Sequence, residues 1–344
     1  MSRYTNGMSI MDSVAVNEPK AHWMPRGIFN LPESTIQFQD YLSRRSALKY
    51  VCTRKGQNRE YIALTECGFD IETTSVDVGN EHHGYMYIWQ LAFDDMLIKG
   101  RTWSQFHWVM SQIQARHPEL GLKRADKGSE KHSVLMAVAN LGYEFQYLSR
   151  QQFNGKYIVD NAFLRTARDP LSVELSWGLN QGAFKAIDVL EIASPSLKEL
   201  GKSYCKTQKL DGDLDYYVSR NSKTPLTWRE EAYCNNDVIV LHEYMTYYLN
   251  VFVKRCKQTP LTKTSIVKSA IAYNFIKMGY DVHELVNLFP DTYADYEKQL
   301  TFLYRGGYTH ANSRHVGKTL EGVHGCFIMW CRHSMLPPSF FISL

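Results

Sequence analysis

Residues 68–74, GFDIETT, decide which fold we expect for this chain. The apolar positions favour a β-strand that ends in the polar run 72–75. Residues i and i+2 of a strand point to the same face, so Asp70 and Glu72 project side by side. Two neighbouring carboxylates repel each other, and a divalent cation neutralises that repulsion. Such a pair can therefore form part of a cation site. Alone, it is better explained as a solvated pair at the end of a strand, because D-x-E occurs often by chance.

The segments around this strand predict a mixed α/β sheet. Apolar runs of strand type come first, and segments with helical periodicity then alternate with further strands. A meander followed by such alternation is typical of a mixed sheet flanked by helices. We expect strands at 61–71, 85–93, 96–101, 133–139 and 186–190, a loop over 116–132, and helices at 103–115, from 144, and at 227–248, 264–278 and 293–303.

We expect four parts along the chain. The first, residues 1–57, is an N-terminal extension with little hydrophobic periodicity and one short helix around 34–50. An α/β domain over 58–250 follows it. A helical connector over 251–313 and a poorly ordered tail over 314–344 complete the chain.

The composition indicates a soluble protein that buries a core. The 344 residues suffice for two ordinary domains or one large domain with appendages, and 44% of them are hydrophobic. The polar N-terminus lacks the apolar segment of a signal peptide, and no run approaches the roughly 20 apolar residues of a membrane span. The seven cysteines include no C-x-x-C pair, which argues against a zinc site. We expect a cytoplasmic protein with no membrane partner, and the net charge of +4 favours polyanionic partners only weakly.

Two later motifs hold further carboxylates. Residues 140–145 (NLGYEF) follow an apolar strand, so Glu144 sits at a strand-to-helix junction where it can face the same cleft. Alone, it is better explained as an acid in a first helical turn, where the helix dipole favours it. Tyr233 and Asp237 share one face of the predicted helix 227–248 and can reach one site. Alone, they are better explained as a core tyrosine and a surface acid.

Taken together, these motifs resemble the exonuclease motifs of family B DNA polymerases, especially the protein-primed polymerases of phages and linear plasmids. Residues 69–74 are similar to the first motif, 140–145 to the second and 233–237 (YCNND) to the third. Residues 212–216 (GDLDY) resemble a stretch in which the family places a substrate-contacting tyrosine. Residues 304–308 (YRGGY) match the Y-x-G-G element that links the exonuclease and polymerase modules and contacts the template strand.

The resemblance covers residues 58–312 and implies a ribonuclease-H-like α/β domain of the DEDD type, followed by a short helical start of a polymerase domain. Four carboxylates would bind two Mg²⁺ or Mn²⁺ ions, which activate the attacking water and stabilise the leaving 3′-oxygen: Asp70, Glu72, Glu144 and Asp237. Tyr233 would orient that water or the scissile phosphate. The frayed 3′ end would be held by Thr73, Asn140, Tyr143 and Tyr216, and the template strand by Tyr304, Arg305, Gly306 and Gly307. The implied partners are a single-stranded DNA 3′ end, template DNA and, for a full-length parent enzyme, a terminal protein.

Two positions depart from the family pattern. The second motif usually ends in Asp, where this chain has Glu144, and the extra methylene shifts the carboxylate oxygens by roughly 1 Å or more. The family also places a lysine directly before the G-D-x-D-Y stretch. That position is Asp211 here, and Lys209 lies two residues earlier. The sequence leaves open whether Lys209 takes the role of the family lysine.

The polymerase metal motifs of the family, D-x-x-S-L-Y-P and Y-x-D-T-D, do not occur in the sequence. Residues 334–337 are only faintly similar to S-L-Y-P, and Cys331 occupies the metal-ligand position. We therefore expect a truncated or frameshifted polymerase product that has 3′–5′ exonuclease activity on single-stranded DNA ends and no polymerase site. Residues 335–344 would be out-of-frame translation. The alternatives are a catalytically silent DNA-binding remnant, a DEDD-type ribonuclease and an unrelated α/β protein with coincidental acids.

Overall fold

The structure, a computed structural model, describes residues 20–115, 123–125, 128–148, 158–166, 169–176, 183–193, 195–211, 218–277 and 279. The chain divides into two units, Met1–Tyr280 and Asp281–Leu344, and every described residue lies in the first. The predicted helix 293–303 and the predicted tail 314–344 lie outside the described residues. Within the described part, no helix combines the length and the apolar character that crossing a membrane requires.

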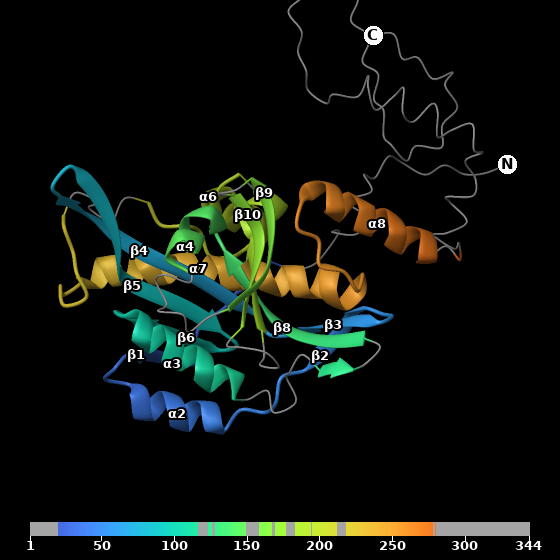
Figure 1. Cartoon of the computed structure of the whole chain (residues 1–344), viewed down its shortest axis with the longest axis horizontal. Helices are drawn as coiled ribbons and strands as arrows, with labels where there is room; N and C mark the ends of the chain where they lie inside the picture. The colour runs from blue at the N-terminus through green and yellow to red at the C-terminus, as the bar shows by residue number, and fades with distance from the viewer. Residues whose placement is uncertain are drawn as a thin grey trace, which may run out of the picture. The chain divides into compact units, whose positions relative to one another are not determined.

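One mixed sheet of 11 strands forms the centre of the fold (Figure 1). Its main path has the order β1-β6-β5-β4-β8-β11-β10-β9, while β2 pairs with β3, and β3 and β7 both pair with β8. β4, β5 and β6 form the predicted antiparallel meander, whereas β4 and β11 run parallel to β8. The strands are β1 Gly27–Asn30, β2 Tyr50–Arg54, β3 Asn58–Ala63, β4 Cys67–Val78, β5 Glu81–Phe93, β6 Met96–Gly100, β7 Lys123–Ala125, β8 Gly128–Val138, β9 Ile158–Thr166, β10 Asp169–Ser176 and β11 Ala183–Asp188.

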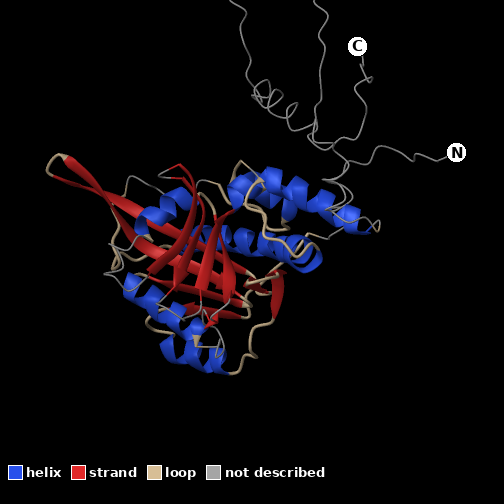
Figure 2. Ribbon diagram, turned by 45° about the vertical axis from the view of Figure 1, so that its right-hand side comes forward, coloured by secondary structure: helices blue, strands red, loops and turns tan. Residues whose placement is uncertain are grey.

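Helices cover both faces of this sheet (Figure 2), so the predicted α/β class is confirmed. Figure 1 shows α2 and α3 on one face and α7 on the other. The helices are α2 Thr35–Ser43, α3 Trp103–Gln114, α4 Leu141–Tyr147, α5 Val189–Ile192, α6 Leu197–Tyr204, α7 Trp228–Tyr248, the π-helix η1 Leu249–Arg255 and α8 Lys263–Lys277. α7 begins at a capping box in which Thr227 and Glu230 bond each other's backbone N–H groups, which fixes the start of the helix.

Alternation along β4 separates the hydrophobic core from the polar site. Phe69 and Ile71 point into the core on the side of α3, where they join Phe106. The intervening residues of a strand face the opposite side of the sheet. Asp70 and Glu72 consequently face α7, although both remain buried.

Some predicted element bounds are wrong. The single segment predicted over 61–71 is two strands, β3 and β4. β4 does not end at the polar run 72–75 but continues to Val78, because residues 73–78 pair with residues 81–86 of β5 in a long hairpin that satisfies their backbone groups. The short helix predicted around 34–50 is present as α2, and the last residue of that range begins β2, which pairs with β3. Part of the predicted loop 116–132 is strand, since β7 and the start of β8 pair with each other.

Candidate active site

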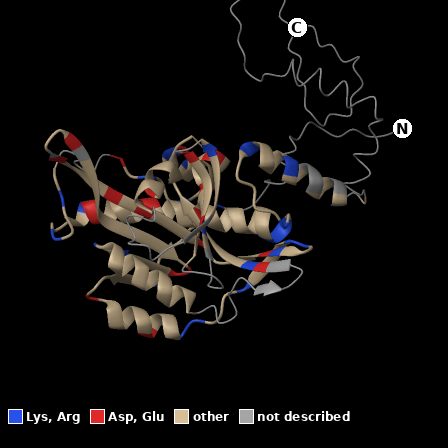
Figure 3. Ribbon diagram, in the orientation of Figure 1, with Lys and Arg blue, Asp and Glu red and all other residues tan. Residues whose placement is uncertain are grey.

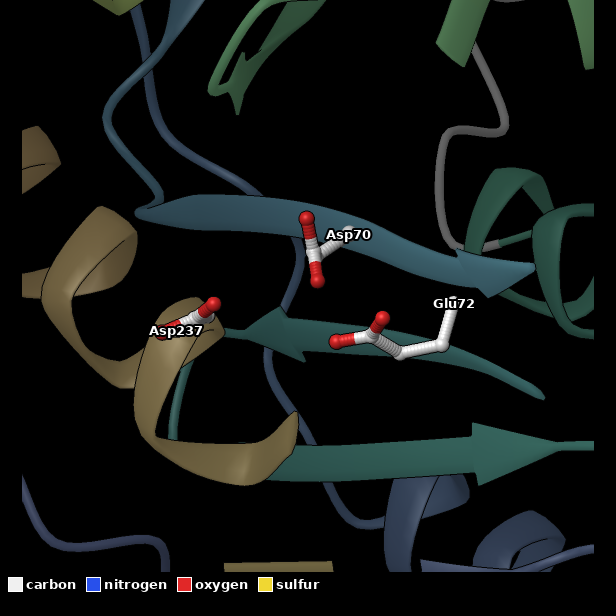
Figure 4. Close-up of side chains that lie close together, drawn as sticks. All are labelled: Asp70, Glu72 and Asp237. Atoms are coloured by element: carbon white, nitrogen blue, oxygen red, sulfur yellow. The ribbon is translucent and has the colours of Figure 1, made fainter. Parts of the chain in front are cut away.

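Three buried carboxylates from two elements meet on the α7 face of the sheet. β4 supplies Asp70 and Glu72, and α7 supplies Asp237. One carboxylate oxygen of each residue lies within 4.8 Å of the other two. Figure 4 shows the three side chains directed toward a common space. The structure thus brings together residues that stand more than 160 positions apart in the sequence, a separation that follows from the numbers 72 and 237.

A glycine allows α7 to approach β4 closely at this point. A Cβ atom at Gly68 would lie 2.8 Å from Cβ of Leu241 and 3.0 Å from the backbone oxygen of Val238. Contacts this short require a shift of the neighbours, and a helix backbone cannot swing aside as a flexible side chain can. Gly68 and Asp70 face the same side of the strand, so the close contact also places Asp237 over the carboxylate pair.

Burial and mutual repulsion make the site unfavourable for negative charge. Figure 3 shows acidic residues along β4. Burial raises the pKa of Asp70 well above its usual value, and the charges of Glu72, Asp237 and Glu144 raise it further. Burial, together with the charge of Asp237, raises the pKa of Glu72 to about 7. Burial also raises the pKa of Asp237, against the opposing charge of Lys209.

The donor set fits a divalent cation. Hard cations such as Mg²⁺ and Mn²⁺ prefer carboxylate oxygens, and buried carboxylates are stable when they are paired or coordinate a metal. Among the described residues, Oδ1 of Asp237 and Oε2 of Glu144 are buried side-chain atoms without a hydrogen-bond partner. A cation among these oxygens would satisfy both the unpaired atom of Asp237 and the repulsion that raises the pKa of Asp70.

Lys209 reaches the same site from an irregular segment between α6 and α7. Its Nζ atom donates hydrogen bonds to Oδ2 of Asp237 at 2.5 Å and to the hydroxyl of Tyr233 at 3.2 Å. The ammonium group also lies 4.7 Å from the centre of the Tyr233 ring. These contacts place Lys209 beside Asp237 and Tyr233, a position that the sequence alone left open. Tyr233 and Asp237 lie on one face of α7, as their spacing predicts, and Lys209 joins them.

Glu144 lies beside the three carboxylates without being part of their group. It is buried in α4, and burial raises its pKa, as do the charges of Asp188 and Glu72. The predicted ligand set is therefore divided in the structure. Asp70, Glu72 and Asp237 converge within 4.8 Å. Glu144 interacts with them through its charge.

Asp188 is a residue of this region that the sequence did not single out. α4 begins after Asn140, which has the left-handed backbone angles φ 62° and ψ 57° and whose side chain makes no capping bond. Oδ2 of Asp188 takes that place and accepts a hydrogen bond from the backbone N–H of Leu141 at 2.9 Å. Its Oδ1 accepts from the N–H of Leu190 at 2.9 Å, so one carboxylate caps both α4 and α5. An aspartate at the end of a strand and before a helical turn is the sequence signal for such a cap.

A cavity of about 580 Å³ lies on the other side of α4. The predicted DNA-contacting residues Asn140 and Tyr143 both line it, together with Arg165, which forms ion pairs with Asp169 and Glu191. The hydroxyl of Tyr143 is hydrogen-bonded to that of Thr73, which ties α4 to β4. Of the four residues predicted to hold a 3′ end, Asn140 and Tyr143 line this cavity and Thr73 contacts Tyr143.

The remaining predicted contacts fall outside the described part of the chain. The 212–216 stretch with Tyr216 and the 304–308 element with Tyr304, Arg305, Gly306 and Gly307 belong to this group.

The sequence matches no protein-family model and no curated protein. The structure is similar to solved structures of phi29 DNA polymerase. The polymerase in its ternary complex with primer-template DNA and incoming nucleotide substrates is 16% identical in sequence to this chain, with a TM-score of 0.51. The match covers 73% of this chain and 40% of the polymerase chain. The binary complex with primer-template DNA is 16% identical, with a TM-score of 0.52 and coverage of 73% and 41%. The complex with single-stranded DNA is 16% identical, with a TM-score of 0.50 and coverage of 72% and 41%.

At this identity the similarity concerns the fold. The fold class that the sequence predicts, a mixed α/β sheet flanked by helices, is confirmed. The predicted resemblance to the protein-primed family B DNA polymerases therefore holds at the level of the fold, over a chain that spans 40% of the length of the polymerase it matches.

Proposed function

We propose that this chain carries a divalent-metal-dependent 3′–5′ exonuclease site that acts on single-stranded DNA ends, as the proofreading site of a DNA polymerase does. The observation that carries the proposal is the group of three buried carboxylates within 4.8 Å: Asp70, Glu72 and Asp237. Such a group costs folding free energy unless a cation neutralises it, so its presence supports a cation site.

Asp70, Glu72 and Asp237 would hold Mg²⁺ or Mn²⁺, with Glu144 as a further ligand beside them. The bound ions would lower the pKa of the attacking water and neutralise the charge on the leaving 3′-oxygen. Lys209 holds Oδ2 of Asp237 and the Tyr233 hydroxyl in fixed positions. Tyr233 would orient the attacking water or the scissile phosphate, and its contact with Lys209 would fix the place of its hydroxyl.

The surroundings of the site support a single-stranded substrate. Tyr143 is 38% exposed and lines the cavity beside α4, so an unpaired base could stack on its ring. Stacking of this kind tolerates any base, as the removal of mismatched nucleotides requires. Phi29 DNA polymerase, whose fold this chain shares, has been solved with primer-template DNA and with single-stranded DNA. Contact of Tyr304–Gly307 with a template strand and a role of Tyr216 at the 3′ end are part of the same proposal.

Nucleotide release from a 5′-labelled single-stranded oligonucleotide tests the proposal. We expect release in the presence of Mg²⁺ or Mn²⁺, none after chelation, and a loss of about 10³-fold or more in Asp70→Ala. Asp77→Ala is the matched control, since Asp77 lies on the same strand β4 but is exposed on the hairpin, away from the carboxylate group.

The outcomes separate the alternatives. DNA binding without nucleotide release by the unmodified protein would favour the silent remnant. Faster release from RNA ends than from DNA ends of the same sequence would favour a ribonuclease. Equal loss of activity in Asp77→Ala and Asp70→Ala would contradict the placement of the site.

A further inference from the structure

Lys209 needs a fixed backbone to remain at the site. A lysine side chain is flexible, and it carries its ammonium group at the end of a four-carbon stem. The 206–210 segment that carries it has no regular secondary structure. Yet its Nζ atom lies at hydrogen-bonding distance from both Asp237 and Tyr233. Something outside the segment must therefore hold the peptide units next to Lys209.

Asn236 makes that connection on both sides of the lysine. Its Oδ1 atom accepts a hydrogen bond from the backbone N–H of Leu210 at 2.9 Å. Its Nδ2 atom donates one to the backbone oxygen of Gln208 at 3.0 Å. A side-chain amide offers one acceptor and one donor group, which matches this pair of backbone groups. Asn236 is itself buried, so these bonds are shielded from competition with water.

The same helix also fixes the start of the segment. Oε2 of Glu243 accepts hydrogen bonds from the backbone N–H groups of Lys206 at 3.0 Å and Thr207 at 2.9 Å. Residues 236 and 243 are about two helical turns apart and lie on one face of α7. On the opposite side, a Cβ atom at Gly201 of α6 would lie 3.2 Å from the oxygen of Thr207, so the glycine leaves room for the segment to pass.

We propose that Asn236 is a positioning residue of the site, which holds the peptide units around Lys209 so that its ammonium group meets Asp237 and Tyr233. The role of Asn236 in catalysis rests on the proposed exonuclease function, whereas the hydrogen bonds of Asn236 to residues 208 and 210 do not depend on it. Asn236 directly precedes Asp237, so one turn of α7 sets the positions of both the carboxylate and the lysine that contacts it. The arrangement also explains how Lys209 reaches the site although it lies two residues before the position of the family lysine. The hydrogen bonds of Asn236 to the backbone of residues 208 and 210 place Lys209 there.

Chemical labelling of the lysine tests the proposal without relying on catalysis. The full chain is reductively methylated for short times, and the labelling rate of each lysine is read by peptide mass spectrometry. We expect Asn236→Ala to raise the rate at Lys209 about tenfold, because the hydrogen bonds that hold the segment are lost. Lys223, which is exposed, serves as the internal standard and keeps its rate. Asn235→Ala is the matched control and leaves Lys209 protected.

The exonuclease assay then shows whether Asn236 acts through Lys209. We expect Asn236→Ala to lower nucleotide release about tenfold in the wild-type background. The same substitution should have no further effect in a Lys209→Met background, since the group that Asn236 positions is then absent. An equal loss in both backgrounds would contradict the positioning role.

The two experiments fail separately. If the Lys209 labelling rate of folded Asn236→Ala equals that of the wild type, the proposal is wrong whatever the enzyme does. If the rate rises but the wild type releases no nucleotide, the exonuclease function is wrong and the hold of Asn236 on Lys209 stands. Should Asn236→Ala fail to fold, Asn236→Leu answers the same question. Leucine keeps the size of the side chain but can neither accept from Leu210 nor donate to Gln208, so the labelling rate must still rise.

Discussion

The two sides of the candidate site are built in different ways. On one side, Asp70, Glu72 and Asp237 come from a twelve-residue strand and a 21-residue helix that pack directly on each other through Gly68. On the other side, Glu144 belongs to the seven-residue helix α4, whose buried residues are Leu141 and Glu144 itself. Packing along a long helix fixes the first side, whereas the second side packs a short helix, with Leu141 and Phe145, against the core and is tied by hydrogen bonds to Asp188 and Thr73.

This difference explains why three acids converge and the fourth stands beside them. A close-packed strand and helix cannot separate without opening a cavity. The short helix α4 has fewer core contacts to lose, and each of its hydrogen bonds contributes only about 1 kcal/mol. We therefore expect the β4–α7 side to be the fixed part of the site and α4 to be the part that adjusts when a cation or a nucleotide binds.

The largest expected effect is the difference in Mn²⁺ affinity between a variant of the β4–α7 side and a variant of the α4 side. In calorimetric titration with Mn²⁺ and without DNA, Asp237→Ala should weaken binding by more than about 100-fold, because it would remove one of the three proposed ligands. Glu144→Ala should weaken it by less than about tenfold, because the three converging carboxylates remain. Asp77→Ala is the control for the loss of an acid on β4. Equal losses in Asp237→Ala and Glu144→Ala would place Glu144 within the primary ligand group.

The next effect concerns the contact that fixes α7 on β4. Gly68→Ala should lower the free energy of unfolding by about 2–3 kcal/mol, at the upper end of the range for overpacking, because its Cβ would meet the backbone of Val238 and His242. Urea unfolding followed by circular dichroism measures this loss, and nucleotide release should fall with it.

Gly79→Ala is the control for this substitution. Gly79 has a φ of 66° but open space around it, so alanine there strains the backbone without pushing on α7. It should lower stability and leave nucleotide release of the folded protein unchanged. A normal exonuclease rate in Gly68→Ala would show that the α7 contact does not set the carboxylate geometry.

The residues of the site also differ in how far the sequence predicts their positions. Strand alternation places Asp70 and Glu72 on one face, and helical spacing places Tyr233 and Asp237 on one face, because both periods are properties of a regular backbone. Lys209 lies on an irregular segment, and its place depends on bonds to a residue 27 positions away, as the numbers 209 and 236 show. No local pattern in the sequence contains such a bond.

The same reason applies to Glu144 and to the length of β4. The distance between Glu144 and the other acids depends on how Asp188 caps α4, which is a tertiary contact. β4 extends through polar residues to Val78 because β5 pairs with it, although the polar run alone is typical of a turn. The general fold follows from periodicity, whereas the fine placement of α4 and Lys209 depends on contacts between elements.

A third prediction tests the fixed side through pH. His242 of α7 is bonded to the backbone oxygen of Asp94 and stacks on Trp23 at 4.0 Å, and burial lowers its pKa to about 4. The unfolded chain, with an ordinary histidine pKa of about 6.5, binds more protons between these values. The contribution of His242 to stability is therefore complete above pH 6.5 and is lost as the pH falls toward 4.

Comparison of the wild type with His242→Phe isolates this contribution, since the raised pKa of Glu72 changes stability in the opposite direction in both proteins. Between pH 7 and pH 5 the wild type should lose about 2 kcal/mol more than the variant in urea unfolding. Phenylalanine retains an aromatic ring against Trp23. Parallel pH profiles for the two proteins would mean that His242 is charged in the folded state.

The smallest expected effect concerns the cap that holds the adjustable side. In Asp188→Asn the amide oxygen can accept from only one of the two N–H groups, Leu141 or Leu190, and the other loses its partner. We expect a loss of about 1 kcal/mol, which is typical of a removed helix cap. Hydrogen–deuterium exchange should become faster across Leu141–Tyr147 of α4 and stay unchanged in α7. Asp169→Asn, which changes an acid of the same cavity that caps no helix, should leave both helices protected. Faster exchange in α7 as well would mean that the two sides of the site open together, and the distinction between a fixed and an adjustable side would then be wrong.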